Sequence, residues 1–483
     1  MKIQLVFAPP LKRPKHYSLS ERTYPPLGIL YLAGYLRKYL PELELKATDG
    51  LLLGLQETFN EISRYGPDVV FISFITPCAQ GAYELARQLK EQDNSLVVVM
   101  GGPHATSLPH EVFAMSPSDI VVSGEGEQTS LELVRALLRK NPLAGINGLY
   151  FKHDGKVIAN NPRQFIADLD EIPFPARDLI NMKDYRGWFV TKNTPETSIL
   201  SSRGCPFDCT FCSNIIWKSS KPWLRLRSPK YIVDEIEHLK RDYSIGEIFD
   251  NGDEFNNNPD HGIAVCNELI SRGLNIQWKA QLRAHPLPEE LVKLMAESGC
   301  WYVHLGIESG SQRTLDGIKK HITLEQVEKA CILLNKYNIK VFGLFMLYNV
   351  WEENGRLQYE NTQDTLKTLE LAKRMVDKGL LSYMSSTITT PYPGSKLFET
   401  AKSHSLFRPG IDHDWERWLT EEDVIMELPG ITRKAVGNIY FRASVLRSYC
   451  YLKSGNWKMK DVPLLANKAL HAIGIKLESI FQE

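Results

Sequence analysis

Three cysteines lie within eight residues of the stretch SSRGCPFDCTFCS (201–213): Cys205, Cys209 and Cys212. Thiolates are soft ligands that suit zinc or an iron–sulfur cluster. A closed structural zinc site needs a fourth ligand. The next cysteine is Cys266, Asp208 is too close in sequence for good geometry, and His238, the nearest histidine, falls on an expected helix. A cluster with three cysteine ligands leaves one iron open to an exogenous chelate, and we prefer this interpretation to zinc.

This spacing, with Phe211 before the last cysteine, resembles that of the radical S-adenosylmethionine enzymes. In that family the open iron of a [4Fe–4S] cluster binds S-adenosylmethionine, and the reduced cluster cleaves it to a 5′-deoxyadenosyl radical. The resemblance is to the cobalamin-dependent members in particular. It rests on motifs in the expected order: PPLGILYLAGYLRK (25–38), GGPHAT (101–106), GEGEQT (124–129), LGIESGS (305–311) and TPYPGS (390–395). It implies a Rossmann-like cobalamin-binding domain and a partial barrel.

The resemblance also implies where S-adenosylmethionine binds, with Phe211 among its contacts. Glu308 and Ser309 belong to the GIESG motif, where a carboxylate can accept hydrogen bonds from ribose hydroxyls. Arg283 ends the third barrel strand, where a guanidinium can pair with the methionine carboxylate. For the α-amino group the acceptor is Asp253 or Glu254, and the spacing in FDNGDEFNNN does not decide between them. Each assignment has a structural alternative. Glu308 could cap the following helix, Arg283 could form a surface ion pair, and Asp253 and Glu254 could be solvated loop carboxylates.

For cobalamin the resemblance points to loops that follow the strands of the first domain. The expected contacts are backbone groups, with two side chains nearby: Thr76, Gly101, Gly102, Gly124 and Gly126, with His104 and Glu125. The first domain has no Asp-x-His-x-x-Gly arrangement to supply a lower cobalt ligand, and His16 is a lone loop histidine. We therefore expect cobalamin with its own base displaced and no histidine on its lower face. Weak lower ligation should favour reduction to nucleophilic cobalt(I).

One loop departs from the family pattern. After the fifth barrel strand the family usually has a Gly-x-Pro-Gly-Glu-Thr-like turn, but this chain reads FMLYNVWEENGRLQYENTQDT. The loop is expected at the barrel mouth, so its large side chains are candidates for substrate contact: Tyr348, Trp351 and Glu352. The remaining cysteines lie in or beside apolar stretches and are expected in the core: Cys78, Cys266, Cys300, Cys331 and Cys450.

The elements that position these residues follow two alternating series. Apolar strands and helices over residues 1–150 predict a parallel sheet covered on both faces. No G-x-G-x-x-G follows its first strand, which disfavours a nicotinamide or flavin dinucleotide. Residues 151–195 are expected to be an irregular linker. Six strand–helix units in 196–400 predict a partial (β/α)6 barrel, because functional-looking residues end nearly every strand. Its helices, and the last helix of the first domain, are expected at 127–140, 229–242, 259–272, 288–298, 324–337 and 361–378.

The last segment, 401–483, is expected to be mostly helical and to carry substrate specificity. Its aromatic residues at helical spacing favour packing over a pocket: Trp415, Trp418, Tyr440, Phe441, Tyr449 and Tyr451. The stretch LLANKALHAIGIKLESIF is amphipathic and could dock a lipid-like substrate, although packing onto the barrel is simpler.

Composition restricts the function classes. Lys plus Arg equals Asp plus Glu, so no net charge favours nucleic acid, and no run of 18 apolar residues predicts a membrane span. We expect a reduced, cytoplasmic enzyme. The leading interpretation is a methyltransferase acting on an unactivated carbon of a small-molecule or lipid-like substrate, with methylcobalamin as methyl donor and a flavodoxin- or ferredoxin-type electron donor. An oxidative cyclase or ring-contracting oxidoreductase is the alternative. The open cluster argues against a third, non-enzymatic possibility, a cobalamin sensor.

Overall fold

The structure, a computed structural model, describes residues 1–12, 24–187, 190–418 and 424–455. The chain divides into two compact units. The first comprises Met1–Ile199, Ser213–Glu247 and His413–Trp418, and the second comprises Leu200–Cys212, Ile248–Asp412 and the described residues after 418.

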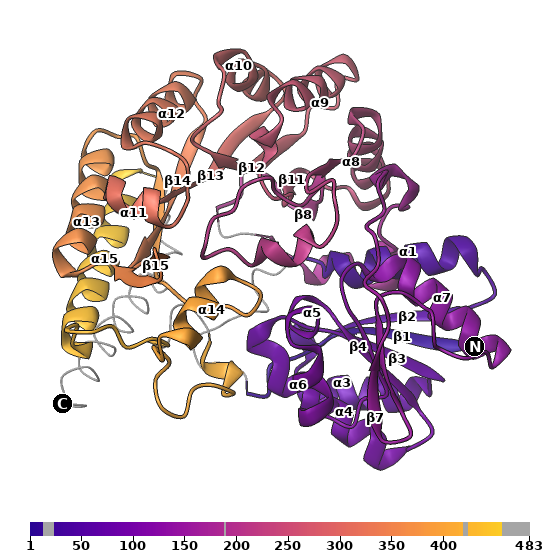
Figure 1. Cartoon of the computed structure of the whole chain (residues 1–483). Helices are drawn as coiled ribbons and strands as arrows, with labels where there is room; N and C mark the ends of the chain where they lie inside the picture. Colours follow the sequence, from indigo (N-terminus) through magenta and orange to yellow (C-terminus); the bar gives the residue numbers. More distant parts are fainter. Residues whose placement is uncertain (13–23, 188–189, 419–423, 456–483) are drawn as a thin grey trace. The chain divides into compact units, whose positions relative to one another are not determined.

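The first unit is built on a seven-stranded sheet of order β2-β1-β3-β4-β5-β6-β7 (Figure 1). Its strands are β1 (Lys2–Phe7), β2 (Glu44–Asp49), β3 (Val69–Ser73), β4 (Val97–Gly101), β5 (Ile120–Val122), β6 (Leu149–His153) and β7 (Lys156–Ala159). The first five strands pair in parallel, whereas β6 and β7 form an antiparallel edge. The last two strands thus extend the sheet beyond residue 150, into the segment expected to be an irregular linker.

Helices cover both faces of this sheet, with α1 and α7 on one face and α3 and α4 on the other (Figure 1). The helices are α1 (Leu27–Tyr39), α2 (Gly50–Leu53), α3 (Leu55–Tyr65), α4 (Ala79–Gln92), α5 (Pro103–Ser107), α6 (Pro109–Met115) and α7 (Gly126–Arg139). The apolar runs VVFIS and VVVMG of β3 and β4 are almost wholly buried between them. This is the arrangement expected of a parallel sheet with helices on its faces.

A carboxyl group at the end of β2 is buried in the first unit. Asp49 caps α2 by accepting a hydrogen bond from the Leu51 amide at 2.9 Å, and the Tyr185 hydroxyl donates to it at 3.1 Å. Burial nevertheless raises the pKa of Asp49 to about 6. Because the folded pKa lies above the unfolded one, the contribution to stability is full below about pH 4 and is lost as the pH rises through about 6.

Replacing Asp49 with asparagine should therefore remove a pH-dependent loss of stability. An amide keeps an acceptor for Leu51 and Tyr185 but carries no charge. Relative to wild type, the free energy of unfolding of the variant should rise by about 1.4 kcal/mol between pH 5 and pH 8. Denaturant unfolding of both proteins at the two pH values measures this difference. A difference that stays constant or falls with pH would show that Asp49 is charged in the folded protein.

The strands of a partial (β/α)6 barrel form a six-stranded sheet of order β17-β14-β13-β12-β11-β8, and all of them except β8 and the first residue of β11 belong to the second unit. The strands are β8 (Glu196–Ile199), β11 (Glu247–Asp250), β12 (Gln277–Arg283), β13 (Cys300–Glu308), β14 (Lys340–Leu347) and β17 (Tyr383–Ile388). The pairings of β12 with β13, β13 with β14 and β14 with β17 are parallel. The carboxyl ends of these strands therefore meet at one edge, where a barrel of this type places its active site.

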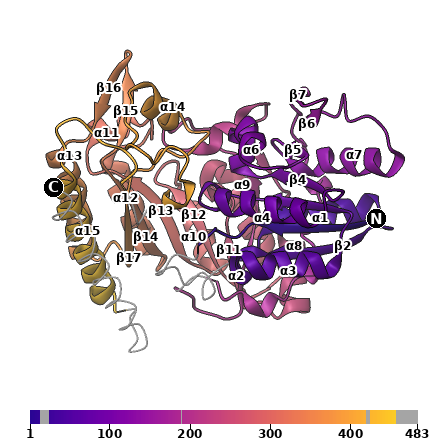
Figure 2. The same cartoon turned by 90° about the horizontal axis from the view of Figure 1, so that it is seen from below.

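The helices of the second series are α8 (Pro229–Tyr243), α9 (Pro259–Ser271), α10 (Glu289–Glu297), α11 (Gln312–Gly317), α12 (Leu324–Lys336), α13 (Thr362–Asp377), α14 (Lys396–Ser403) and α15 (Arg433–Lys453). All six expected helices agree with the structure to within one residue at each end. The C-terminal region is helical as predicted: α15 packs against α13 and β17 (Figure 2). Of the aromatic residues expected to pack there, four are buried: Trp415, Trp418, Tyr440 and Tyr451.

The loop that departs from the family pattern is a β-hairpin. β15 (Val350–Glu353) pairs antiparallel with β16 (Arg356–Tyr359). The two residues between them, Asn354 and Gly355, have φ values of 50° and 71°. Two successive positive φ angles favour Asn-Gly, and the resulting turn matches the twist of the flanking strands.

Candidate functional site

The cysteine loop lies in the second unit. Cys205 is buried, whereas Cys209 and Cys212 are partly exposed, and all three thiols are free of disulfides. Burial, together with the nearby carboxylate of Glu254, raises the pKa of Cys205 to about 12. A coordinating metal reverses such a shift, because it deprotonates the thiol that binds it.

The end of β12 brings a guanidinium to this loop. Arg283 is buried, with its guanidinium carbon 3.7 Å from the centre of the Phe207 ring and Nη1 3.9 Å from the Cys209 sulfur. Asn256 fixes the end of the strand: its side-chain oxygen accepts from the Arg283 amide at 2.9 Å, and its amide donates to the Arg283 carbonyl at 2.8 Å. The backbone clamp positions the arginine beside the cysteine loop.

A buried lysine, which the sequence analysis did not single out, completes the group. Lys320 Nζ lies 2.9 Å from Glu308 Oε1 and 3.9 Å from Glu254 Oε1, which is itself 3.9 Å from Arg283 Nη1. Burial alone would lower the pKa of Lys320, but the carboxylates of Glu308 and Glu254 outweigh it and raise the pKa. Two cations and two anions thus lie together, contributed by the ends of β12 and β13, the loop after β11 and the segment between α11 and α12.

The GIESG motif makes room for this ion pair. A Cβ atom on Gly306 would lie 2.7 Å from both Lys320 Nζ and Glu308 Oε1, so a larger residue would displace the ends of these two side chains. Glu308 itself has a φ of 65°, which is uncommon for a residue with a side chain. Strained backbone of this kind persists where the surroundings fix it and is concentrated at functional sites.

The atoms left without partners fit the methionine end of S-adenosylmethionine. Among the described residues, Nε and Nη2 of Arg283 and Oε2 of Glu254 are buried and have no hydrogen-bond partner. A carboxylate would satisfy the guanidinium and an ammonium would satisfy the glutamate, at a site where unmade hydrogen bonds are costly. Asp253, the other candidate for the α-amino group, is exposed.

Within the part of the chain that is described, no group of three or more His, Cys, Asp or Glu side chains could hold a single metal ion. The thiols of a cluster do not have to meet this condition, because each binds a different iron.

The Ser309 side chain makes hydrogen bonds within the second unit. Its hydroxyl donates to Glu360 Oε1 at 2.7 Å and lies 3.3 Å from the Thr368 hydroxyl, and Glu360 Oε2 accepts from the Asn349 amide at 3.0 Å. Burial raises the pKa of Glu360. The structure thus gives the Ser309 side chain a role in joining β13 to the loop after β14, while its contact with S-adenosylmethionine stays a prediction.

Two cobalamin candidates have partners inside the first unit. His104 is buried; its Nδ1 lies 3.1 Å from the Thr76 hydroxyl, its Nε2 lies 3.2 Å from the Tyr83 hydroxyl, and its ring packs edge-on against Trp415. Glu125 is buried and binds both terminal nitrogens of Arg225, at 2.8 and 2.9 Å. The side chains of His104 and Glu125 therefore make hydrogen bonds and ion pairs within the protein.

Replacing Arg225 with methionine should test the structural role of Glu125. Removal of the cation leaves a buried carboxylate without its charge partner, so the free energy of unfolding should fall by about 3 kcal/mol. Chemical unfolding of the apoprotein measures this loss. A matched control is Arg139→Met at the exposed end of α7, which should change the stability by less than about 0.5 kcal/mol. Equal effects would contradict a structural ion pair.

The glycine loops after β4 and β5 fit the approach of a large planar group. Gly124 has a φ of 82°, and a Cβ built on it would meet no atom within 4 Å. At Gly101 and Gly126 the nearest atoms would be 3.4 and 3.8 Å away. Gly102 differs, because its Cβ would lie 2.8 Å from the backbone of Phe74. Open backbone at the carboxyl ends of parallel strands suits a ligand such as cobalamin.

The three candidates for substrate contact take different positions. Tyr348 is buried and lines a hollow beside the end of β14. Trp351 is buried against Gly317, where a Cβ would lie 2.2 Å from its ring. Glu352 is exposed and lies 3.3 Å from Nε2 of His404. His16 and the amphipathic stretch LLANKALHAIGIKLESIF fall outside the described residues.

Two family models match the chain. The Radical SAM superfamily model matches residues 199–355, and the B12 binding domain model matches residues 20–134. A protein of Pyrococcus horikoshii described as an uncharacterized methyltransferase is 34% identical over 458 residues, covering 92% of this chain and 94% of the relative. The chain belongs to the cobalamin-dependent radical S-adenosylmethionine enzymes. It uses a [4Fe–4S] cluster, S-adenosylmethionine and cobalamin.

Other relatives of this radical enzyme differ in activity. An anaerobic magnesium-protoporphyrin IX monomethyl ester cyclase of Rubrivivax gelatinosus is 32% identical over 385 residues, covering 78% of this chain and 66% of the cyclase. The solved structure of the cobalamin-dependent radical enzyme OxsB, with aqua-cobalamin and S-adenosylmethionine bound, has the same fold. It has a TM-score of 0.73 at 17% identity, covering 98% of this chain and 72% of OxsB. None of the described helices is long and apolar enough to span a membrane.

Proposed function

We propose that this enzyme is a methyltransferase that acts on an unactivated carbon. The observation that carries the proposal is the match along 94% of the Pyrococcus relative described as a methyltransferase. When bound, the cluster would supply the electron for cleaving S-adenosylmethionine, which provides the radical chemistry at the substrate carbon, and cobalamin would supply the methyl group.

In this proposal the chain's residues bind and orient. Cys205, Cys209 and Cys212 hold the cluster. Arg283 pairs with the methionine carboxylate and Glu254 accepts from the α-amino group, because both have buried atoms without a hydrogen-bond partner and both belong to the charged group beside the cysteine loop.

Glu308 would accept from the ribose, and the glycine loops of residues 1–150 would hold cobalamin. A flavodoxin- or ferredoxin-type protein is the proposed electron donor.

The cyclase relative supports a second candidate, a radical oxidoreductase that transfers no methyl group. Its identity to this chain is similar, 32%, but the matched region covers only 66% of its length. The two activities share the cysteine loop and the motifs at the strand ends, so the products must distinguish them.

The test uses anaerobically reconstituted protein with cobalamin, a reductant and methyl-labelled S-adenosylmethionine. Methyl transfer predicts labelled methylcobalamin together with 5′-deoxyadenosine and S-adenosylhomocysteine. If 5′-deoxyadenosine forms while cobalt is never methylated, the oxidoreductase takes precedence. The search for products then turns to compounds that lose hydrogen and gain no carbon.

A further inference from the structure

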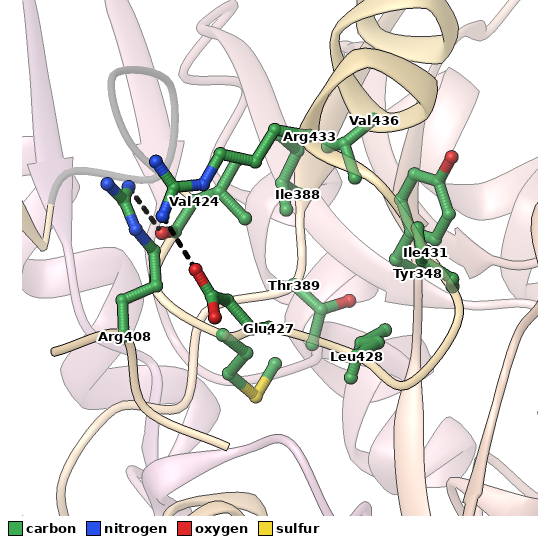
Figure 3. A pocket seen from close by; sticks show the side chains of 11 residues that line it. Tyr348, Ile388, Thr389, Arg408, Val424, Glu427, Leu428, Ile431, Arg433 and Val436 are labelled. Carbon is green, nitrogen blue, oxygen red and sulfur yellow. Dashed lines mark hydrogen bonds and ion pairs between the residues drawn. The ribbon is translucent and has the colours of Figure 1, made fainter. Parts of the chain in front are cut away.

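A short segment of the C-terminal region belongs to the first unit. Residues 413–418, which we call the tryptophan segment, are part of the same unit as the glycine loops, whereas the described residues on either side of it belong to the second unit. Those flanking residues pair with each other. The Arg408 amide donates to the Ile425 carbonyl at 3.1 Å, and the Arg408 guanidinium donates to the Val424 carbonyl at 3.0 Å (Figure 3). The chain thus passes from the second unit into the first and back.

A buried indole anchors the tryptophan segment to α6. Trp415 is 1% exposed, and its Nε1 donates to Glu111 Oε1 at 2.6 Å. His413 lies at the other carboxylate oxygen, with its Nδ1 3.3 Å from Glu111 Oε2. Burial alone would raise the pKa of Glu111, but hydrogen bonds from His104 and Trp415 outweigh it and lower the pKa. Because a carboxylate with little exposure needs such partners, Glu111 fixes the segment in place.

The same contacts reach the short helix α5. The His104 ring packs edge-on against Trp415, with 5.0 Å between the ring centres. The Nδ1 atom of His104 lies 3.1 Å from the hydroxyl of Thr76, in the loop after β3. Two residues further along α5, the Thr106 hydroxyl accepts from the amide of Gly124, in the loop after β5, at 3.0 Å. The helix α5 therefore connects the tryptophan segment to the loops after β3, β4 and β5.

The loop after β1 is held by the tryptophan segment as well. The Lys12 amide donates to Glu416 Oε1 at 2.8 Å, and the side chain of Gln80, in α4, donates to the His413 carbonyl at 3.2 Å. In the sheet order β2-β1-β3-β4-β5 the chain direction reverses between β1 and β3, and parallel sheets bind their ligands at such a point. The loops that flank this point and the two glycine loops thus share one set of supporting contacts.

We propose that Trp415 is a positioning residue for cobalamin, which through Glu111 and His104 fixes the loops that would hold the corrin. The assignment rests on the proposed cobalamin site and holds whether methyl transfer or cyclisation follows. Loops that are already ordered lose less conformational entropy when a ligand binds, so their order raises the affinity. Phenylalanine in place of Trp415 keeps a ring against His104 but has no N–H for Glu111. The loops then lose order, and cobalamin binds more weakly.

The test measures binding of hydroxocobalamin to the full chain with its cluster reconstituted, by anaerobic equilibrium dialysis. Trp415→Phe should raise the dissociation constant about tenfold, because a hydrogen bond to a charged group is lost. Trp278→Phe is the matched control. Trp278 is 3% exposed, lies at the amino end of β12, and donates from Nε1 to the Ser298 carbonyl at 3.1 Å. Its loss should also lower the free energy of unfolding, but the dissociation constant should change by less than about twofold.

A second measurement needs no variant. The Arg417 amide donates to the Asp414 carbonyl at 3.0 Å, and the Trp418 amide donates to the Trp415 carbonyl at 3.1 Å. Because coupling between two sites is reciprocal, a segment that supports cobalamin binding must itself be stabilised by bound cobalamin. Hydrogen exchange of these two amides should therefore slow when hydroxocobalamin is added to the wild-type protein.

A variant of the loop itself separates the two assignments. Gly124→Val places a side chain at a φ of 82°, in space that is open around the backbone, so hydroxocobalamin binding should be lost. If this variant binds normally, the proposed cobalamin site is wrong and the role of Trp415 falls with it. If it loses binding, the positioning role alone is overturned in any of three cases: Trp415→Phe binds like wild type, Trp278→Phe weakens binding equally, or cobalamin leaves the exchange of the two amides unchanged.

Discussion

Glu254→Gln should raise the dissociation constant of S-adenosylmethionine about thirtyfold and slow 5′-deoxyadenosine formation accordingly. The expected size follows from the loss of one charge-assisted hydrogen bond, worth about 2 kcal/mol, between a buried carboxylate and an ammonium group. Glu254 Oε2 is buried and lacks a partner among the described residues, so the amide offers no equivalent acceptor for a cation. Equilibrium binding and single-turnover formation of 5′-deoxyadenosine on reduced protein measure the two effects.

The neighbouring acid supplies the matched control. Asp253 is exposed, so Asp253→Asn should change both quantities by less than about twofold. Iron and sulfide analysis of each variant separates a binding defect from loss of the cluster. An effect of Asp253→Asn equal to or larger than that of Glu254→Gln would transfer the α-amino contact to Asp253.

The helices and the strand ends could be predicted because side-chain periodicity is local. The six expected helices are amphipathic segments bounded by loops, and each agrees with the structure to within one residue. The β15–β16 hairpin also had a local signal, the Asn354-Gly355 pair, which the sequence analysis did not use. In the loop that departs from the family pattern, the Asn-Gly pair was therefore sufficient to predict a β-hairpin.

Side-chain partners from distant segments were harder to foresee. Lys319 and Lys320 are neighbours in the sequence, yet only Lys319 is exposed, beside Asp208. Lys320 is buried because carboxylates 12 and 66 positions earlier in the chain converge on it. Glu125 lies between two open glycines, and its partner Arg225 is 100 residues away. A motif thus locates the functional loop, while the distant partner decides what each side chain in it does.

Lys320→Met should lower the free energy of unfolding of the second unit by about 3 kcal/mol. The side chain is only 5% exposed and Glu308 only 10%, so the substitution leaves Glu308 buried without its cation, while Glu254 keeps only Arg283 at 3.9 Å. It should also weaken S-adenosylmethionine binding, because Glu308 loses the contact that fixes it above Gly306. Denaturant unfolding of the apoprotein and equilibrium binding to the reconstituted protein measure the two losses.

A double variant separates the causes. In Lys320→Met/Glu308→Gln the uncompensated charge at Glu308 is gone, so at least about 1 kcal/mol of stability should return. S-adenosylmethionine binding should stay weak, since the ribose acceptor has lost its charge. Lys319→Met is the surface control, with a side chain that is 55% exposed, and should change the stability by less than about 0.5 kcal/mol. If the double variant is no more stable than the single one, the loss of stability in Lys320→Met does not come from an unpaired buried charge.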